Sequence, residues 1–242
     1  MNYKKKFVGL ILVRSKSKRL PNKCFLKFGK MNILEHIIKR CKFYKIEPIV
    51  CTSKNKYDDK IIFYAKKNKV KYFRGSEKNK LKRIADCSKK LNLEKFHLVD
   101  ADDPFFCGKE MIRSLKKLQN ENLDVVYPTK LSFKGTGLVG YSIKNSAIKK
   151  INKMIKKNID TENLFKIFKL AKNLKIRYLN ETKKRIFARL TLDYYEDYVF
   201  LELIRLLNGN FAKREKIELF LKKNKFLTKI NLFRNIEWKK NQ

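Results

Sequence analysis

The stretch FVGLILVRSKSKRLPNK, from Phe7 to Lys23, decides the fold of this chain. It begins with an apolar run, Phe7 to Val13, which is too short to cross a membrane and has the length and composition of a buried parallel strand. The run ends in a loop that contains five cationic residues, two serines and a proline. Because open α/β sheets bind ligands at the carboxyl ends of their strands, this loop predicts a polyphosphate site. The alternative is a solvated basic loop in a lysine-rich chain.

Downstream of the loop, short apolar runs alternate with stretches of helical periodicity. In the first such stretch, apolar residues recur at Leu34, Ile37, Ile38 and Cys41, the spacing of one helix face. Further strands are expected at 46–52, 70–73 and 96–99, and helices are expected to begin near 32, 58, 79 and 109. This alternation predicts an α/β fold in which helices cover both faces of a mostly parallel sheet.

Beyond Asp124 the alternation is less regular, and residues 124–193 are expected to form a small excursion. Strands are expected at 125–129, 138–143, 176–179 and 186–192, and helices around Phe165, at 196–207 and at 217–221. A chain of 242 residues can bury one large core, and its sequence has no Pro-, Gly- or Ser-rich linker. We therefore expect a single domain over residues 1–242, in which 124–193 contributes to acceptor binding or to a homodimer.

The formal net charge of +38 would ordinarily indicate binding to nucleic acid or to an anionic membrane. The excess consists of 49 lysines against 12 arginines, spread over every segment of the chain. Arginine is the residue favoured for bidentate contacts to phosphates and bases, so this composition argues against nucleic-acid binding as the main function. The same positive field would still attract a small anionic substrate.

The cysteines and the start of the chain indicate a cytoplasmic protein. Five scattered cysteines with no C-x-x-C pair are typical of reduced thiols. The basic residues at 4–6 precede only a short apolar run, which is not the pattern of a secretory signal. The sequence contains no run of about 18 apolar residues, so we expect no membrane-spanning segment.

Within the basic loop, the order R-x-x-S-x-R-L-P-x-K, from Arg14 to Lys23, resembles the signature of the cytidylyltransferases that make CMP-activated sugar acids. The resemblance is closest to the spore coat polysaccharide and acylneuraminate cytidylyltransferase branch, and the CMP-ketodeoxyoctonate synthetases are related. It continues through short motifs over most of residues 7–200: GK at 29–30, ILEH at 33–36, TS at 52–53, DD at 58–59, FRGSE at 73–77, DDP at 102–104 and RLTLD at 189–193. Together, their order and spacing are specific.

The resemblance implies a fold of the nucleotide-diphospho-sugar transferase type and an Mg²⁺-dependent activity. The enzyme would transfer CMP from CTP to a sugar acid or similar anionic acceptor, releasing pyrophosphate, for surface polysaccharide or glycan synthesis. Two alternatives remain open. One is a transferase that uses another nucleotide or a phosphonate acceptor. The other is a non-catalytic nucleotide- or RNA-binding protein on the same fold, since Val13 and Ala101 stand where the family usually has alanine and glycine.

The resemblance also implies which residues form the site. Arg14, Lys23 and Asp102 are expected to be catalytic, and Asp102 and Asp193 to hold Mg²⁺. Contacts to the nucleotide are expected from Val13, Arg14, Ser15, Ser17, Arg19, Lys23, Thr52, Arg74 and Ser76. The acceptor is expected to lie against Gly137, Tyr141, Glu162 and Arg189.

Each carboxylate of the implied metal pair has a simpler alternative role. Asp102 could belong to a turn that caps the helix beginning near Lys109, and Asp193 could cap the helix beginning near Glu196. A shared metal site requires that the two carboxylates, far apart in the sequence, reach the same edge of the sheet.

Overall fold

A computed structural model describes residues 7–154, 161–171, 173–182 and 184–240. Its main sheet has seven strands in the order β5-β4-β1-β6-β8-β7-β9. These strands are β1 (Phe7–Leu12), β4 (Ile46–Ser53), β5 (Lys71–Gly75), β6 (Lys95–Asp100), β7 (Val125–Tyr127), β8 (Ser142–Lys144) and β9 (Ile176–Tyr178). Only β8 is antiparallel to its neighbours among these described strands, so the expected mostly parallel sheet is confirmed. A separate short hairpin pairs β2 (Lys27–Phe28) with β3 (Met31–Asn32).

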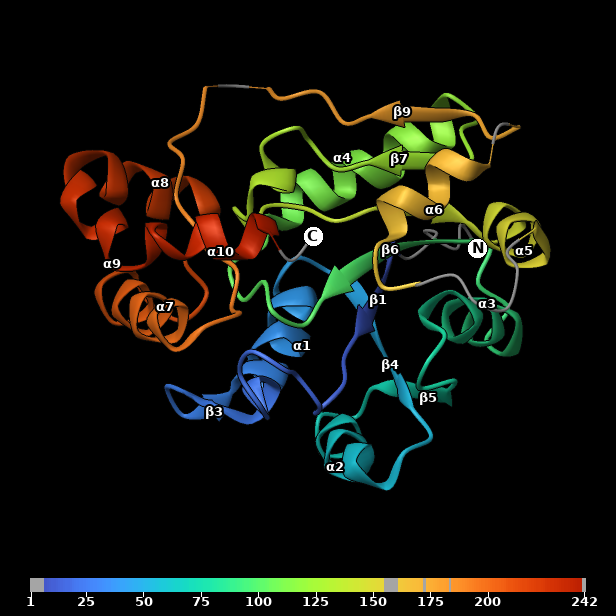
Figure 1. The fold of residues 1–242 in the computed structure, drawn as a ribbon, viewed down its shortest axis with the longest axis horizontal. Coiled ribbons are helices and arrows are strands. Elements are labelled where there is room, and N and C mark those ends of the chain that lie inside the picture. The colour runs from blue at the N-terminus through green and yellow to red at the C-terminus, as the bar shows by residue number, and fades with distance from the viewer. Residues whose placement is uncertain (1–6, 155–160, 172, 183, 241–242) are drawn as a thin grey trace, which may run out of the picture.

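Helices cover both faces of the sheet (Figure 1). They are α1 (Ile33–Phe43), α2 (Asp59–Lys67), α3 (Lys80–Lys90), α4 (Gly108–Asn120), α5 (Asn145–Met154), α6 (Leu164–Leu170), α7 (Tyr195–Asn208), α8 (Arg214–Lys223), α9 (Lys229–Leu232) and α10 (Arg234–Lys240). Buried residues of α1, α2, α4, α7 and α8 share one hydrophobic cluster, and those of α3, α5 and α6 share the other. The two clusters lie on opposite faces, and α7 to α10 group together beside the sheet in Figure 1.

Strand β1 shows why the opening stretch decides the fold. Its side chains alternate between the two faces, so Leu10 and Leu12 join one cluster and Ile11 joins the other. Both faces are covered, which is why the strand is continuously apolar rather than alternating with polar residues. Helix α1 then begins with a capping box, in which Asn32 and Glu35 each accept a hydrogen bond from the other's backbone N–H.

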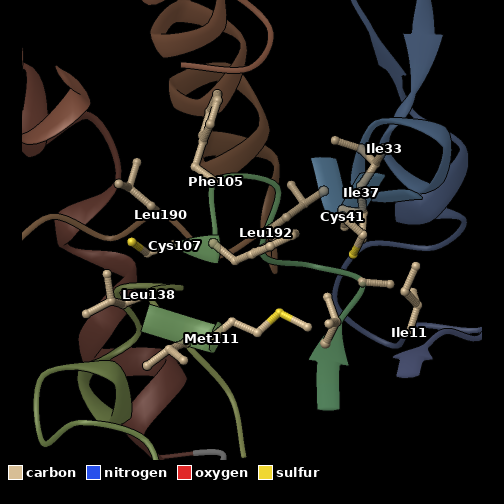
Figure 2. Packing of buried hydrophobic residues seen from close by; sticks show 14 of the residues in the cluster. Ile11, Ile33, Ile37, Cys41, Phe105, Cys107, Met111, Leu138, Leu190 and Leu192 are labelled. Carbon is tan, nitrogen blue, oxygen red and sulfur yellow. The ribbon is translucent and has the colours of Figure 1, made fainter. Parts of the chain in front are cut away.

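The second half of the chain differs from the expectation in three places. The strand expected at 138–143 is confined to β8, and the strand expected at 186–192 is absent from the described residues there. Helix α5 was not expected at all. Residues 188–192 are instead buried without pairing to a strand, and Figure 2 shows Leu190 and Leu192 in the same core as Phe105 and Leu138. An apolar run therefore indicated burial correctly but not a neighbouring strand.

The buried backbone of 186–192 finds its partners outside any strand ladder. The Asn231 side chain donates to Arg189 O, and Leu192 N donates to Asp102 O at 2.7 Å. From the rest of 124–193, β7, β8 and β9 join the main sheet rather than forming a detached arm. Whether this segment also forms a homodimer stays a prediction.

Among the described residues, no helix combines the length and the apolar character needed to cross a bilayer.

Candidate active site

The carboxyl ends of β1 and β6 are neighbours in the sheet, because Leu12 pairs with Asp100. The basic loop leaves β1 at this edge, and an acidic turn that includes Asp102 and Asp103 leaves β6 beside it. Two adjoining cavities open here. We call the first, of about 570 Å³, the loop cavity, since the end of β1, the basic loop and the start of α3 line it. The second, of about 560 Å³, is the aromatic cavity, which Phe133, Tyr141, Phe165 and Trp238 help to line.

The two cavities meet at a junction of charged side chains. Five residues line both of them: Arg19, Lys80, Asp100, Asp102 and Glu162. The loop cavity as a whole has seven cationic side chains against three acidic ones. A ligand with several negative charges is therefore favoured in the loop cavity, with one end at the junction.

At the junction, one ammonium bridges two carboxylates. Lys23 Nζ lies 2.8 Å from Asp102 Oδ2 and 3.0 Å from Asp193 Oδ1, and it donates to Leu192 O at 2.7 Å. Burial acts to lower the pKa of Lys23, but the two carboxylates outweigh it and raise that pKa above its ordinary value. Burial acts to raise the pKa of Asp193, but Lys23 and Arg19 hold it below its ordinary value. Lys23 and Asp193 are therefore both charged near neutral pH.

The residues present fit a magnesium ion. The Asp102 and Asp193 carboxylates are close enough to share one cation, Lys23, so a metal ion could bind the same oxygens once the Lys23 ammonium moves aside. In the described part of the chain, no three His, Cys, Asp or Glu side chains form a group that could hold a metal. Mg²⁺ suits such a site, because it typically binds one or two carboxylates and completes its shell with phosphate oxygens and water.

Neither carboxylate has the helix-capping role that was its alternative. Helix α4 is preceded by Cys107 at its N-cap, and Asp102 faces Lys23 instead. At the start of α7, the Asp197 carboxylate accepts from the backbone N–H groups of Asp193 at 2.9 Å and Tyr194 at 3.0 Å. Asp197 thus caps this helix, which leaves the Asp193 side chain directed at the junction.

Arg189, expected to contact the acceptor, is fully buried and lines neither cavity. Its guanidinium forms two hydrogen bonds with Asp197, at 2.8 and 3.0 Å, and one with Asp193 Oδ2 at 3.2 Å. It also donates to Asn235 Oδ1 at 3.0 Å, and Asn231 donates to Asp197 Oδ1 at 2.8 Å. This geometry supports a role in orienting Asp193.

Some residues of the basic loop line the loop cavity, whereas others are buried against the rest of the protein. Five of the residues expected to contact the nucleotide line the loop cavity: Val13, Arg14, Ser17, Arg19 and Lys23. Their contact with a nucleotide stays a prediction. Arg14 is also paired with Glu162 at 2.8 Å, and Arg19 with Asp193 at 2.6 Å. Both arginines therefore line the loop cavity while they are held by carboxylates.

Ser15 is buried and lies outside both cavities. Its backbone N–H and its hydroxyl both donate to Asp58 Oδ1, at 2.8 and 2.7 Å. Burial acts to raise the pKa of Asp58, but hydrogen bonds from Ser53 and Ser15 lower it below its ordinary value. The ionised Asp58 thus fixes the start of the basic loop to the end of β4.

Thr52, Arg74 and Ser76 lie at the same edge of the sheet but line neither cavity. Thr52 is fully buried in β4 and pairs with Arg74 of β5. Arg74 donates to Ser53 O and to Asn55 O and forms an ion pair with Asp59 at 2.6 Å. Ser76 Oγ accepts from Asn79 N, just before α3. These contacts connect the ends of β4 and β5 to the segments that follow them, and direct contact with a nucleotide stays a prediction for all three.

Gly137, Tyr141 and Glu162, three of the four expected acceptor residues, line the aromatic cavity. Gly137 has a φ of +55°, and a Cβ there would lie 2.7 Å from both Asp103 Oδ1 and Leu190 O. Only glycine tolerates both conditions, so the cavity wall can approach the acidic turn this closely. Tyr141 packs edge-on against Tyr127 and Phe168, which fixes its ring.

The structure adds cavity residues that the sequence reasoning missed: Lys80, Arg83, Asp103, Phe133, Phe165 and Trp238. The first two had a usable signal, because the helix expected at 79–91 begins just past the carboxyl end of the third strand. Their spacing of three residues puts both on one side of that helix. Trp238 had no such signal, since α10 reaches the site only through tertiary packing.

Comparison with known proteins agrees with this geometry. A profile of the cytidylyltransferase family matches residues 8–231. An uncharacterized protein of Methanocaldococcus jannaschii is 31% identical over 232 residues, which are 93% of this chain and 94% of that protein. The chain therefore belongs to the cytidylyltransferase family.

Solved structures confirm the nucleotide-diphospho-sugar transferase type of fold. A cytidylyltransferase from Leptospira borgpetersenii serovar Hardjo-bovis superposes with a TM-score of 0.83 at 24% identity, over 92% of this chain and 96% of the other. A CMP:2-keto-3-deoxy-manno-octonic acid synthetase, solved in complex with CTP, superposes with a TM-score of 0.60 at 13% identity, over 84% of this chain and 98% of the other.

Proposed function

We propose that this chain transfers CMP from CTP to a sugar acid or a similar anionic acceptor, with release of pyrophosphate, in the synthesis of a surface polysaccharide or glycan. The observation that carries the proposal is the junction of the two cavities, where Asp102 and Asp193 both lie within 3.0 Å of Lys23. Membership of the cytidylyltransferase family supports CTP as the donor. The CTP complex of the synthetase with the same fold supports it as well.

In this proposal the triphosphate of CTP occupies the loop cavity. A hydroxyl of the acceptor attacks the α-phosphorus, so a new P–O bond forms while the bond to the oxygen that bridges to the β-phosphate breaks. The electron pair of that bond leaves with pyrophosphate, and the proton of the hydroxyl is released. Negative charge gathers on phosphate oxygens during this step, where Arg14, Arg19 and Lys23 can stabilise it.

Asp102 and Asp193 are the residues that would hold Mg²⁺. When bound, the ion would neutralise phosphate charge and polarise the α-phosphate. Lys23 and Arg19 keep the Asp193 carboxylate ionised, and Arg189 orients it from behind. Lys23 would thus act both on the phosphates and on the geometry of the metal site.

Calorimetric titration with CTP, UTP, ATP and dTTP, with and without Mg²⁺, tests the donor. We expect selective binding of CTP that Mg²⁺ strengthens, and loss of the Mg²⁺ effect in Asp102→Asn with an unchanged circular dichroism spectrum. Equal affinity for all four nucleotides would favour the non-catalytic binding protein instead. Once the donor is fixed, pyrophosphate release in the presence of candidate acids identifies the acceptor.

A further inference from the structure

An acidic acceptor needs a positively charged partner, because a carboxylate that leaves water without one loses its solvation uncompensated. The aromatic cavity offers few such partners. Arg19 and Lys80 are the two cationic side chains among the described residues that line it, against five acidic ones. Although the sequence has 49 lysines, only Arg19 and Lys80 of the described residues are therefore candidates for binding an acceptor carboxylate in this cavity.

Arg19 already has a role at the junction. Its Nη2 lies 2.6 Å from Asp193 Oδ1, and its guanidinium stands 5.7 Å from the centre of the Tyr194 ring. Arg19 is also one of the charges that keep the pKa of Asp193 below its ordinary value. In the proposed function Arg19 also stabilises phosphate charge, so an acceptor carboxylate would have to compete with both Asp193 and the triphosphate for this guanidinium.

Lys80 has capacity to bind an incoming anion. Its Nζ lies 3.8 Å from Asp100 Oδ1, a separation longer than a hydrogen bond, and its side chain is 15% exposed. An ammonium has three donors, so a second carboxylate can bind with good geometry. Lys80 lines both cavities, so an anion bound there would sit at the junction.

The backbone around Lys80 fixes this position. Lys80 N donates to Thr161 Oγ1 at 2.8 Å, and the Asn79 side chain caps α3 by accepting from Lys82 N at 2.8 Å. The first turn of α3 also presents the positive end of the helix dipole to the junction. The lysine therefore extends from a rigid helix start rather than from a loop.

We propose that Lys80 binds the acid group of the acceptor and thereby makes the enzyme specific for an anionic acceptor. This inference rests on the proposed function and names the residue that recognises the acceptor. In the ring form of a 2-keto sugar acid, the carboxylate and the anomeric hydroxyl are on the same carbon atom. A carboxylate held by Lys80 thus brings that hydroxyl to the junction, next to the phosphate that it attacks.

The single tryptophan of the chain provides a direct readout, because Trp238 lines the same cavity. Its fluorescence can be followed while N-acetylneuraminic acid, or the uncharged methyl ester of that acid, is added without nucleotide. The two probes differ in the one charge that Lys80 is proposed to bind. The variants are Lys80→Met, Lys80→Arg and, as a matched control, Lys82→Met. Lys82 is exposed on the same helix and pairs with Asp86 at 2.9 Å.

The acid should bind the wild type more tightly than the ester does. Lys80→Met should weaken binding of the acid about tenfold or more, as expected for the loss of a hydrogen bond to a charged group. It should leave binding of the ester unchanged. Lys80→Arg should restore part of the acid affinity, and Lys82→Met should behave as wild type. Thermal unfolding of each variant checks that the fold is retained, and Lys80→Gln replaces Lys80→Met if the latter fails to fold.

The assignment of Lys80 would be overturned if the wild type bound the acid and the ester equally well, or bound neither. It would also be overturned if Lys80→Met bound the acid as tightly as the wild type does. Calorimetry with CTP on the same proteins keeps the proposed function separate. Absence of CTP binding to the wild type would overturn the proposed function alone, because the comparison of acid and ester requires no nucleotide.

Discussion

Lys23 and Asp102 are 79 residues apart in the sequence and form an ion pair of 2.8 Å. This contact joins the basic loop after β1 to the acidic turn after β6. The ion pair thus brings a cation and a carboxylate from two different motifs together at the junction of the two cavities. In the proposed function, the cation acts on the phosphates and the carboxylate holds the metal.

Replacing Lys23 by methionine should reduce turnover strongly. The variant removes a cation from the point where phosphate charge develops, and such losses typically cost about 10²- to 10³-fold in rate. Pyrophosphate release measures the effect, and circular dichroism shows whether the fold persists. Lys27→Met is the matched control, because Lys27 is exposed and lies four residues further along. Wild-type turnover in Lys23→Met would contradict the assignment of this residue.

Replacing Arg189 by methionine should destabilise the protein and slow the reaction. Removing one partner from a buried ion pair costs about 3–5 kcal/mol, and here the carboxylates of Asp193 and Asp197 would both lose a partner. Urea unfolding measures the free-energy change. Lys82→Met is the control, since its pair with Asp86 is exposed and such pairs contribute about 0–1 kcal/mol. A similar loss of stability in both variants would argue against the proposed positioning role.

Replacing Glu162 by glutamine should tighten the binding of CTP. Glu162 forms a partly exposed ion pair with Arg14 at 2.8 Å, and incoming phosphates must compete with it. Weakening this pair should improve the dissociation constant by up to about fivefold, the equivalent of roughly 1 kcal/mol. Calorimetry measures it, with Glu47→Gln as control, because Glu47 pairs with Lys71. Weaker CTP binding in Glu162→Gln would mean that Glu162 assists the nucleotide rather than competing with it.

Acid should destabilise the protein through His97. Burial lowers the pKa of His97 to about 3, whereas a histidine in the unfolded chain titrates near 6.5. Between these values the unfolded state binds the extra proton, so stability is lost as pH falls from about 6.5 toward 3. The slope is at most about 1.4 kcal/mol per pH unit for one group.

The variant His97→Gln should therefore show a shallower loss of stability between pH 6 and pH 4 than the wild type in urea unfolding. The neutral ring is buried and held by two hydrogen bonds, because Nε2 accepts from Gly140 N at 3.2 Å and Nδ1 contacts Ser142 Oγ at 2.8 Å. Burial also lowers the pKa of His36 to about 3, so His36→Gln should have a comparable effect. An unchanged slope in both variants would show that other groups control the acid sensitivity.

Much of the first half could be predicted from sequence because its signals are local. The apolar run of β1, the Asn32 cap and the helical spacing of Leu34, Ile37 and Cys41 depend on neighbours in the chain, and the structure confirms the elements they indicate. The basic loop could be placed for the same reason. A loop after the first strand of a parallel sheet opens at a known edge.

The features of the second half that the sequence did not predict depend on tertiary contacts. The apolar residues of 186–192 looked like a strand, but their backbone is bonded by Asn231 and Asp102 rather than by a neighbouring strand. Arg189 looked like a substrate contact because it is a cation in a motif, and only the positions of Asp197 and Asn235 make it a buried support. The spacing of residues within a motif does not reveal such partners, because they come from other segments of the chain.

The support of Asp193 by Arg189, Asn231 and Asn235 has a consequence for how the protein is made. The basic loop and Asp102 leave the ribosome early, whereas Asn231 and Asn235 are among the late residues to be translated. A nascent chain that still lacks α9 therefore has the cations of its basic loop but not the side chains that hold Arg189 and Asp197 beside Asp193. The orientation of Asp193 is thus coupled to the completion of α9 and α10, although the basic loop and Asp102 are made much earlier.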